Sequence, residues 1–457
     1  MSSLLGTMSI ALGALEAQQA GLQTTTNNIA NLNTPGYTRE RPLLEEADPV
    51  IQNGMALGNG VDLKGIQSLR DSILELQIGD ETQQQGKSQA LVNAMSQVQT
   101  LFPDDTTGIG QQISNFFQSL NSLSTDPSDI TLRQSVLSAA NGVATAFNDA
   151  ANQLSSVSGG IDLNVEQTVG QVNQITQQIA AINSQLDQVN SSSQDYGSFL
   201  DQRDNLIQQL SGLIDVSVIN NGSSLTLTTK QGTPLVVDGK SFALSTALDT
   251  SSGTQHVYTQ DGTDITAQIS GGQLGGLVQA RDQSLASVQT QLDSLASGFS
   301  QALNAAQAEG FDLNGDAGGD LFSTASGAGA AASMTVAITD PSLLAASSDG
   351  TTGSNGNLAN LSAVANQAVS NGLTPTQAYA NLVFEAGSTV SDGTTELNAS
   401  NTMLQQLQQQ QSSISGVSLD EEASNLLLYQ RAYQAAAQAI STVNQMLQTA
   451  IDMKAGT

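Results

Sequence analysis

The sequence predicts a mainly α-helical protein, an elongated helical bundle and coiled coil formed by both chain ends and the middle, with a small inserted all-β domain. Two observations support this. Apolar residues recur at alternating three- and four-residue steps at both ends and through the middle, which is the spacing that coiled coils bury. Between residues 216 and 269 the pattern changes to alternating Val, Thr, Leu and Ser between Gly-containing turns, which is typical of half-buried strands.

The first helix is expected over residues 1–33. Its apolar stripe consists of Leu5, Met8, Leu12, Leu15, Leu22 and Ile29, with Gln19 and Thr26 at the two polar positions. The sequence Asn33-Thr34-Pro35-Gly36 ends the helix, because proline followed by glycine favours a type II turn. Gly6, Gly13 and Gly21 each cost about 1 kcal/mol relative to alanine in a helix interior. We therefore expect this helix to need a partner.

A matching stripe follows Gly416 near the C-terminus. It consists of Leu426, Tyr429, Tyr433, Ala436, Ile440, Val443, Leu447 and Ala450. We expect the two end helices to pair with each other. Because isolated helices of this length are marginal in water, we also expect them to complete their fold by assembling with other copies.

Helical spacing also organises the middle of the chain. Helices are expected at about 70–102 (ended by Pro103-Asp104-Asp105), 113–123, 129–157, from Gly159-Gly160 to 189, 199–213, 276–310, 358–385 and 392–414. Residues 37–68 are expected to be extended or irregular, and turn pairs such as Asn221-Gly222 interrupt the β segment. The expected domains are a terminal coiled-coil assembly domain (1–64 and 415–457), a helical bundle domain (65–214 and 272–414, with 323–357 irregular and rich in Gly, Ala and Ser) and an inserted β domain (215–271).

The composition excludes several classes of function. The 457-residue chain carries a formal charge of −29 with 12 basic residues, which disfavours nucleic acid and anionic membranes as partners. With one histidine and no cysteine, zinc and thiol chemistry lose their usual ligands. No segment is apolar enough for a membrane span. No basic residue precedes Arg39, unlike in a cleaved signal peptide.

Two acidic stretches are candidate sites. Asp312-Leu313-Asn314-Gly315-Asp316 resembles the start of a calcium loop, but Ala317 and Ser323 stand where a glycine and a bidentate glutamate belong. Asp104-Asp105 would need a second carboxylate brought from elsewhere for hydrolysis. We interpret both stretches as turns or helix caps.

Two further positions also have simple interpretations. His256 has no Ser–His–Asp order around it and is expected to be an exposed surface histidine. Arg203, between Asp201 and Asp204, is expected to form a solvated ion-pair cluster on a helix. The sequence therefore predicts no catalytic, cofactor-binding or metal-binding residue.

Motifs at both ends carry a resemblance to a known family. The stretch from Asn27 to Arg39 (NNIANLNTPGYTR) resembles the N-terminal signature of bacterial flagellar rod, hook and hook-associated proteins. Residues 416–422 (GVSLDEE) and 426–435 (LLLYQRAYQA) resemble the family of flagellar hook-associated protein 1. Interior residues 199–204 and 270–277 agree with it, whereas the β insertion and residues 323–357 carry no motif.

The resemblance implies a structural axial component of the flagellum, an adaptor ring that joins hook to filament without catalysis and without a cofactor. It implies a secreted, extracellular location, reached without a cleaved signal peptide. The implied partners are other copies in a ring-like homo-oligomer, the hook protein, a second junction protein on the filament side, the flagellar export apparatus, and an export chaperone that binds the C-terminal helix. Nucleic acid and membranes are not among them. The residues expected at assembly contacts are Leu12, Leu15, Asn28, Asn31, Thr34, Pro35, Gly36, Tyr37, Leu426, Tyr429, Tyr433, Ile440, Val443 and Leu447.

Other interpretations stay open at this point. Another rod- or hook-type axial protein shares the N-terminal signature, although residues 416–422 disfavour hook protein. The signature itself disfavours flagellin. A secreted hydrolase with a coiled-coil stalk would need converging catalytic groups in or beside residues 216–269, where the sequence offers none.

Overall fold

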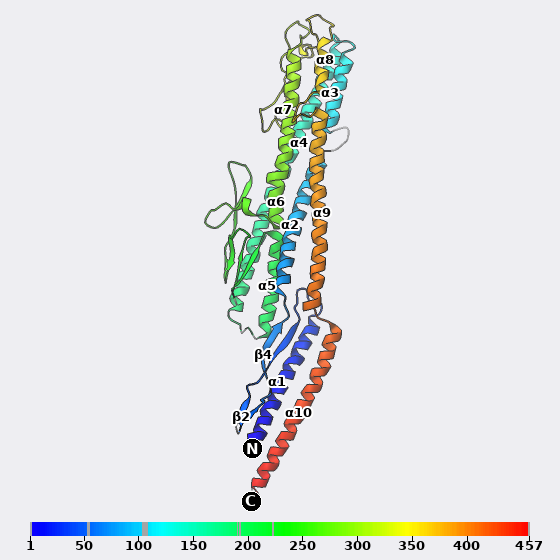
Figure 1. Cartoon of the computed structure of the whole chain (residues 1–457). Coiled ribbons are helices and arrows are strands. Elements are labelled where there is room, and N and C mark those ends of the chain that lie inside the picture. The colour runs from blue at the N-terminus through cyan, green and yellow to red at the C-terminus, as the bar shows by residue number, and fades with distance from the viewer. Residues whose placement is uncertain are drawn as a thin grey trace. The chain divides into compact units, whose positions relative to one another are not determined.

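A computed structural model describes residues 2–52, 55–102, 108–189, 191, 193–221 and 224–455 (Figure 1). It is mainly helical with several small sheets, which confirms the predicted fold class. The helices are α1 (Ser2–Ala30), α2 (Ser72–Thr100), α3 (Ile109–Leu123), α4 (Ile130–Leu186), α5 (Gln194–Leu213), α6 (Gly272–Gln279), α7 (Ala286–Ala308), α8 (Gly356–Ala363), α9 (Pro375–Ser415) and α10 (Leu419–Ala455). Within the described ranges, none of them has a stretch both long and apolar enough to cross a membrane.

The strands are short and antiparallel. They are β1 (Glu40–Glu46), β2 (Val50–Gln52), β3 (Met55–Leu57), β4 (Val61–Ser68), β5 (Ser217–Asn221), β6 (Ser224–Thr228), β7 (Pro234–Val237), β8 (Lys240–Ser241), β9 (Ser245–Leu248), β10 (Gln255–Tyr258), β11 (Phe322–Ser323) and β12 (Thr335–Val336). The predicted β segment thus does form strands, as a four-stranded sheet β5–β6–β7–β8 and a separate hairpin β9–β10. The turn expected at Asn221-Gly222 includes a residue outside the described ones, and Pro103-Asp104-Asp105 lies wholly outside them.

The chain divides into two compact units. The first, here called the terminal unit, comprises residues 1–83, 171–244 and 400–457. The second, the central unit, comprises residues 84–170 and 245–399. Both chain ends and the four-stranded sheet belong to the terminal unit, whereas the β9–β10 hairpin belongs to the central unit.

The core of the central unit is built around three phenylalanines. Phe116 on α3, Phe299 on α7 and Phe322 on β11 are at most 1% exposed, and their ring centroids lie 5.8 to 6.1 Å apart. Such spacing suits edge-on aromatic packing. Nearby, the buried Arg133 donates to the backbone carbonyls of Pro127, Pro341 and Leu344. Backbone carbonyls therefore accept the hydrogen bonds of this buried guanidinium, and the charge of Asp312 also favours its charged form.

One helix that the sequence predicted as two separate helices is continuous. The break expected at Gly159-Gly160 is wrong, because α4 runs through it for 57 residues. A Cβ at either glycine would meet nothing within 4 Å, so both lie on an open face. Leu154, Ile161 and Val165 continue the buried stripe on both sides of the pair. This packing outweighs the glycine cost of about 1 kcal/mol each.

The break that the sequence predicted between residues 385 and 392 also lies elsewhere in the chain. The sequence predicted helices over 358–385 and 392–414, whereas the structure has the short α8 and then α9, which spans 41 residues. The chain turns at Asn371 and Gly372, which have positive φ angles of 49° and 78°. Pro375 then begins α9, since proline suits the first helical turn.

The segment between α1 and α2 contains more order than the sequence suggested. Residues 37–68, expected to be extended or irregular, include two antiparallel hairpins, β1 with β4 and β2 with β3. Pro42 and the glycines at 58, 60 and 65 obscure the alternation that would have predicted these strands. The ladder between β1 and β4 has an irregularity between Leu43 and Leu44, which further breaks the pattern.

Candidate functional site

The chain changes direction sharply after α1. The helix ends at Ala30, and the N–H of Tyr37 donates to the carbonyl of Thr34 at 3.2 Å, which closes the predicted turn. Gly36 has a φ of 75°, a conformation that favours glycine. A side chain at this position would also overlap Asn205 on α5. Local sequence therefore fixes the path from α1 into β1. The end of α1, the turn and the start of β1, residues 27–40, are here called the corner.

Asn28 is the hydrogen-bonding centre of the corner, with 1% of its surface exposed. Its Nδ2 donates to the backbone carbonyl of Glu40 at 2.9 Å and to the carboxylate of Glu422 at 3.2 Å. Its Oδ1 accepts from the backbone N–H of Glu40 at 3.0 Å and from the hydroxyl of Tyr37 at 2.8 Å. One side chain thus joins α1, β1 and α10.

The other polar residues of the motif hold the turn. Asn31 donates to the carbonyl of Asn27 at 3.1 Å, and the hydroxyl of Thr34 donates to Asn31 Oδ1 at 3.1 Å. Asn27 donates to the hydroxyl of Tyr37 at 3.2 Å. Asn31 and Tyr37 are half-buried, whereas Thr34, Pro35 and Gly36 are exposed.

Arg39 joins the corner to the start of α10. Its guanidinium lies 2.7 Å from the carboxylates of both Glu421 and Glu422. Its backbone N–H donates to the carbonyl of Ser415 at 2.9 Å. The Glu422 side chain is 2% exposed, so this carboxylate depends on its partners. Removing one partner of such a buried pair leaves an uncompensated charge, which is strongly destabilising.

An ion-pair cluster lies between α5 and the segment after β4, and Thr38 of the corner donates its backbone N–H to Asp201 of this cluster at 3.1 Å. Arg70 pairs with both Asp201 and Asp204. The expected solvated cluster around Arg203 is wrong, because Arg203 is 9% exposed and donates to Asn183 instead. Residues three apart share a helix face, which brings both aspartates to Arg70, while the residue between them faces elsewhere.

Burial and charge raise the pKa of Glu40 to about 7, from an ordinary value of 4.5. Burial is the largest cause, and the nearby Asp201 adds to it, while Asn27 and Arg70 act in the opposite direction. Burial also raises the pKa values of Tyr37 and Asp201. One carboxylate oxygen of Glu40 is buried without a hydrogen-bond partner. The corner therefore favours the protonated form of this carboxyl group.

Helices α1 and α10 pack antiparallel through small residues. Asn28 contacts Glu422 while Gly21 faces Tyr429, so rising numbers on α1 match falling numbers on α10. A Cβ at Gly21 would come within 2.7 Å of the Tyr429 ring, and the nearby Ala17 is fully buried. The absence of side-chain bulk on this face lets the aromatic ring approach the α1 backbone.

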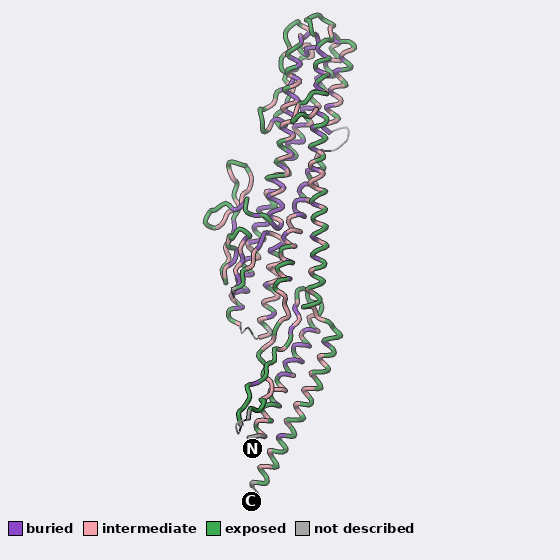
Figure 2. Tube along the Cα trace, viewed as in Figure 1, coloured by how far each residue is buried: buried purple, intermediate pink, exposed green. Residues whose placement is uncertain are grey.

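The leucine stripe predicted for α1 is not the buried face of that helix. Leu5 and Leu12 are 61% and 44% exposed, and Leu15 is half-buried. Figure 2 shows the mixture of exposed and half-buried positions along the two terminal helices. Close approach through Ala and Gly competes with burial of Leu, and here the small face contacts the partner helix. The leucines are left available for contacts outside the chain.

The stripe predicted on α10 does lie on a covered face. Val443 is 5% exposed. The half-buried members are Leu426, Tyr429, Tyr433, Ile440 and Leu447. Leu427 and Leu428, just off the stripe, are 56% and 63% exposed. The heptad pattern thus located the contacting face of α10.

The residues missing from the sequence-based candidates include Arg39, Glu40, Arg70 and Glu422. A signal existed for one pair, because Arg39 ends the N-terminal motif and Glu422 ends a C-terminal one, with opposite charges. Arg70 gave no such signal, since its partners lie on the distant α5. Glu40 gave none because it meets Asn28 through its backbone N–H and C=O, which other residue types also supply.

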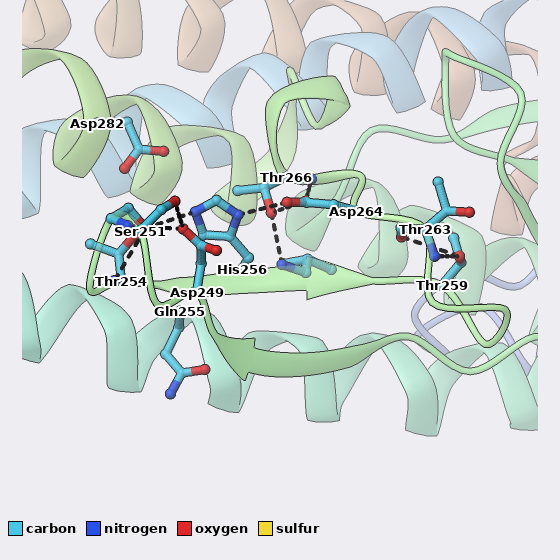
Figure 3. Close-up of polar contacts among 12 residues, drawn as sticks. Asp249, Ser251, Thr254, Gln255, His256, Thr259, Thr263, Asp264, Thr266 and Asp282 are labelled. Atoms are coloured by element: carbon cyan, nitrogen blue, oxygen red, sulfur yellow. Dashed lines mark hydrogen bonds and ion pairs between the residues drawn. The ribbon is translucent and has the colours of Figure 1, made fainter.

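The central unit brings a serine, a histidine and an aspartate together, which the sequence did not anticipate. Figure 3 shows the histidine and the aspartate, His256 and Asp264, facing each other. His256 Nδ1 lies 2.7 Å from Asp264 Oδ2, and Nε2 lies 3.2 Å from the Ser252 hydroxyl. Acyl-transfer chemistry would need free N–H groups aimed at a developing oxyanion. The N–H groups of Ser252 and Thr254 instead donate to Asp249 and to the Ser252 hydroxyl. The arrangement fastens the β9–β10 hairpin.

The weak calcium-loop resemblance is a tight turn. Asp312 Oδ1 accepts the backbone N–H groups of Asn314 at 2.8 Å and of Asp316 at 3.0 Å. These bonds occupy the carboxylate that would otherwise face a cation. Across the part of the chain that the structure describes, no three His, Cys, Asp or Glu side chains gather as metal ligands would.

Three family models match this chain, and together they show its class of protein. The rod-protein family model "Flagella basal body rod protein" matches residues 8–38, and the C-terminal model of the basal body rod FlgEFG proteins matches residues 408–453. The helical domain of flagellar hook-associated protein FlgK matches residues 95–322. The chain is therefore a structural component of the bacterial flagellum. With relatives along its whole length, it belongs to the FlgK family of flagellar hook-associated proteins.

Those relatives include flagellar hook-associated protein 1 of Escherichia coli (strain K12), 26% identical over 551 residues, which span 99% of this chain and 100% of the relative. The protein of the same name from Bacillus subtilis (strain 168) is 29% identical over 500 residues, 99% of each chain. The solved structure of the flagellar hook junction protein FlgK from Burkholderia pseudomallei shares the fold, with a TM-score of 0.69 at 19% identity. That match covers 74% of this chain and 100% of that one.

We expect Gly21→Ala to loosen the pairing of α1 with α10, because its methyl group would meet the Tyr429 ring. Overpacking of this kind costs about 1–3 kcal/mol. Gly6→Ala is the matched control, since a Cβ there meets nothing within 4 Å and should stabilise α1 by about 1 kcal/mol. Hydrogen exchange on the full chain should be faster over residues 17–28 in Gly21→Ala only. Equal protection in both variants would contradict the close contact.

Glu40 should make stability depend on pH. Its pKa is about 7 in the folded chain and 4.5 ordinarily, so the folded state holds the extra proton between these values. Stability is therefore lost as pH rises through this window, and the penalty is complete above it. In urea unfolding, Glu40→Gln should gain stability over the parent above pH 7 and gain little below pH 4.5. The exposed control Glu45→Gln should show no such difference, and a pH-independent effect of Glu40→Gln would refute the assignment.

Proposed function

We propose that this chain forms a ring-like homo-oligomer that joins the flagellar hook to the filament as a structural adaptor, without catalysis. The observation that carries the proposal is the apolar surface left open on the terminal unit. Leu5 and Leu12 on α1, and Leu427 and Leu428 on α10, are each at least 44% exposed. These apolar side chains, left uncovered on both terminal helices, are the surface that other copies would cover. Membership in the FlgK family supports the flagellar setting.

The proposed partners follow from the same surface and from the relatives. The hook protein would contact one side of the ring and a second junction protein the filament side, consistent with relatives that are named hook-associated and hook junction proteins. Before assembly, an export chaperone would cover the C-terminal helix, whose Leu427, Leu428 and Met446 are more than half exposed. The net charge of −29 would keep free copies apart until specific apolar faces meet.

We also propose secretion through the flagellar export apparatus to an extracellular position, without a cleaved signal peptide. Cleavage near the N-terminus would remove part of α1, which spans Ser2–Ala30. Asn28 and Gly21, which hold β1 and α10, lie on that same helix. Retention of the N-terminal segment therefore suits the architecture of the terminal unit.

An alternative location of this chain within the flagellum has one observation in its favour. Both chain ends match family models of rod proteins, so another rod- or hook-type location is the alternative. Immunogold labelling of purified flagella would separate the two. Label confined to the hook–filament boundary supports the proposed junction, whereas label along the rod or hook would overturn it.

We expect Val443→Asp to abolish the junction. Val443 is 5% exposed on the covered face of α10, where apolar burial is worth about 1.5–3 kcal/mol and an unpaired charge adds a further cost. Because the change is repeated in every copy, cells with only this variant should export the chain and shed unpolymerised flagellin. Asn444→Asp is the matched control, because it adds the same charge at an exposed polar position next to Val443. Normal filaments in Val443→Asp cells would show that this face is dispensable for assembly.

A further inference from the structure

Beside the corner, the terminal unit contains an open cleft of about 320 Å³. The corner contributes Gly36 and Thr38 to its wall. Leu76 on α2 and Ile207 on α5 give it an apolar lining, and Arg203 gives it a polar one. This volume falls at the lower end of the range of ligand-binding pockets.

Arg203, in the wall of this cleft, does not have all of its hydrogen-bond donors paired. It is 9% exposed, yet its one hydrogen bond to a described residue is a long contact of 3.4 Å from Nη1 to Asn183. Its Nε is buried without a partner. Among the ion pairs of the described residues, none includes Arg203. A buried guanidinium left in this state is costly, so the cleft suits a ligand that supplies acceptor oxygens.

The charges in the cleft favour a neutral ligand over an anionic one. Asp201, Asp204 and Glu75 already line it, with Arg70 among them. A further carboxylate or phosphate would meet three acidic groups. Backbone carbonyls avoid this repulsion, and they are what satisfies the buried Arg133 of the central unit. The cleft therefore fits an uncharged peptide strand with aliphatic side chains.

The same terminal unit carries such a strand. In the β2–β3 hairpin, Val50, Ile51 and Leu57 are 53%, 77% and 48% exposed. Residues 49–61 contain no charged side chain. The hairpin is a two-stranded sheet. The backbone N–H and C=O groups that point outward from its two edges are therefore not paired by the hydrogen bonds between β2 and β3. Isolated hairpins are marginally stable in water, so this one gains from being covered.

We propose that the β2–β3 hairpin of one copy docks into the cleft of a second copy. Carbonyl oxygens at its edge accept hydrogen bonds from Arg203, and Val50 and Ile51 pack on the lining formed by Leu76 and Ile207. None of the described residues of the hairpin, 50–52 and 55–57, lines the cleft of the same copy. Hairpin and cleft are different surfaces, so the contact is head-to-tail, the type that generates a ring when the rotation closes. The inference rests on the proposed homo-oligomer and names its contact.

Engineered cysteines test this directly, because the chain has none of its own. Ile51→Cys combined with Leu76→Cys places one thiol on the hairpin and one in the cleft, and a disulfide requires the two Cβ atoms to be about 3.5–4.5 Å apart. Flagella from cells with only this variant should yield a ladder of cross-linked multimers after mild oxidation. Each single variant should yield no multimer beyond a dimer. The control pair Ile51→Cys with Phe384→Cys, at a residue 72% exposed outside the cleft, should yield no ladder.

The outcomes separate the docking from the proposed function. Normal filaments without a ladder would overturn the docking and leave the junction role intact. Failure of the parent chain to support filaments in the same cells would overturn the role itself. Ile51→Asp provides a second readout, since it changes an exposed side chain and should weaken each contact at least about tenfold. Unimpaired filament assembly in Ile51→Asp cells would also overturn the docking.

Discussion

The terminal unit depends on satisfying one buried amide, that of Asn28. Its donors and acceptor are taken up by Glu40, Tyr37 and Glu422, so α1, β1 and α10 are held by the same side chain. Leaving any one of these buried groups unpaired costs about 1–3 kcal/mol. The contact between Gly21 and Tyr429, two turns away on α1, keeps the helices close enough for these bonds to form.

This arrangement decides which surfaces are left for assembly. Because α1 meets α10 through glycine and alanine, its leucines remain exposed, and the covered face of α10 is used up within the chain. A pairing through leucines would have buried more apolar area but left less to offer other copies.

Local signals were enough to predict much of the fold from the sequence. Pro35 and Gly36 defined the turn after α1, and the heptads located the covered face of α10. Contacts between distant segments were not readable, as with Asn28 and Glu422, which lie 394 positions apart. Gly159-Gly160 misled because an exposed glycine pair is tolerated when the buried stripe continues. The leucine stripe of α1 misled because periodicity shows that a helix has an apolar face but not which partner covers it.

The central claim is that the terminal helices of each copy pair through their small-residue face and present the leucine face to other copies. Electron cryomicroscopy of hook–filament junctions built with this chain tests it most directly. The account predicts that Gly21 lies against Tyr429 of the same copy, while Leu5 and Leu12 are buried against another copy. A junction in which α1 and α10 of one copy are separated, or in which Leu5 and Leu12 face water, would contradict it.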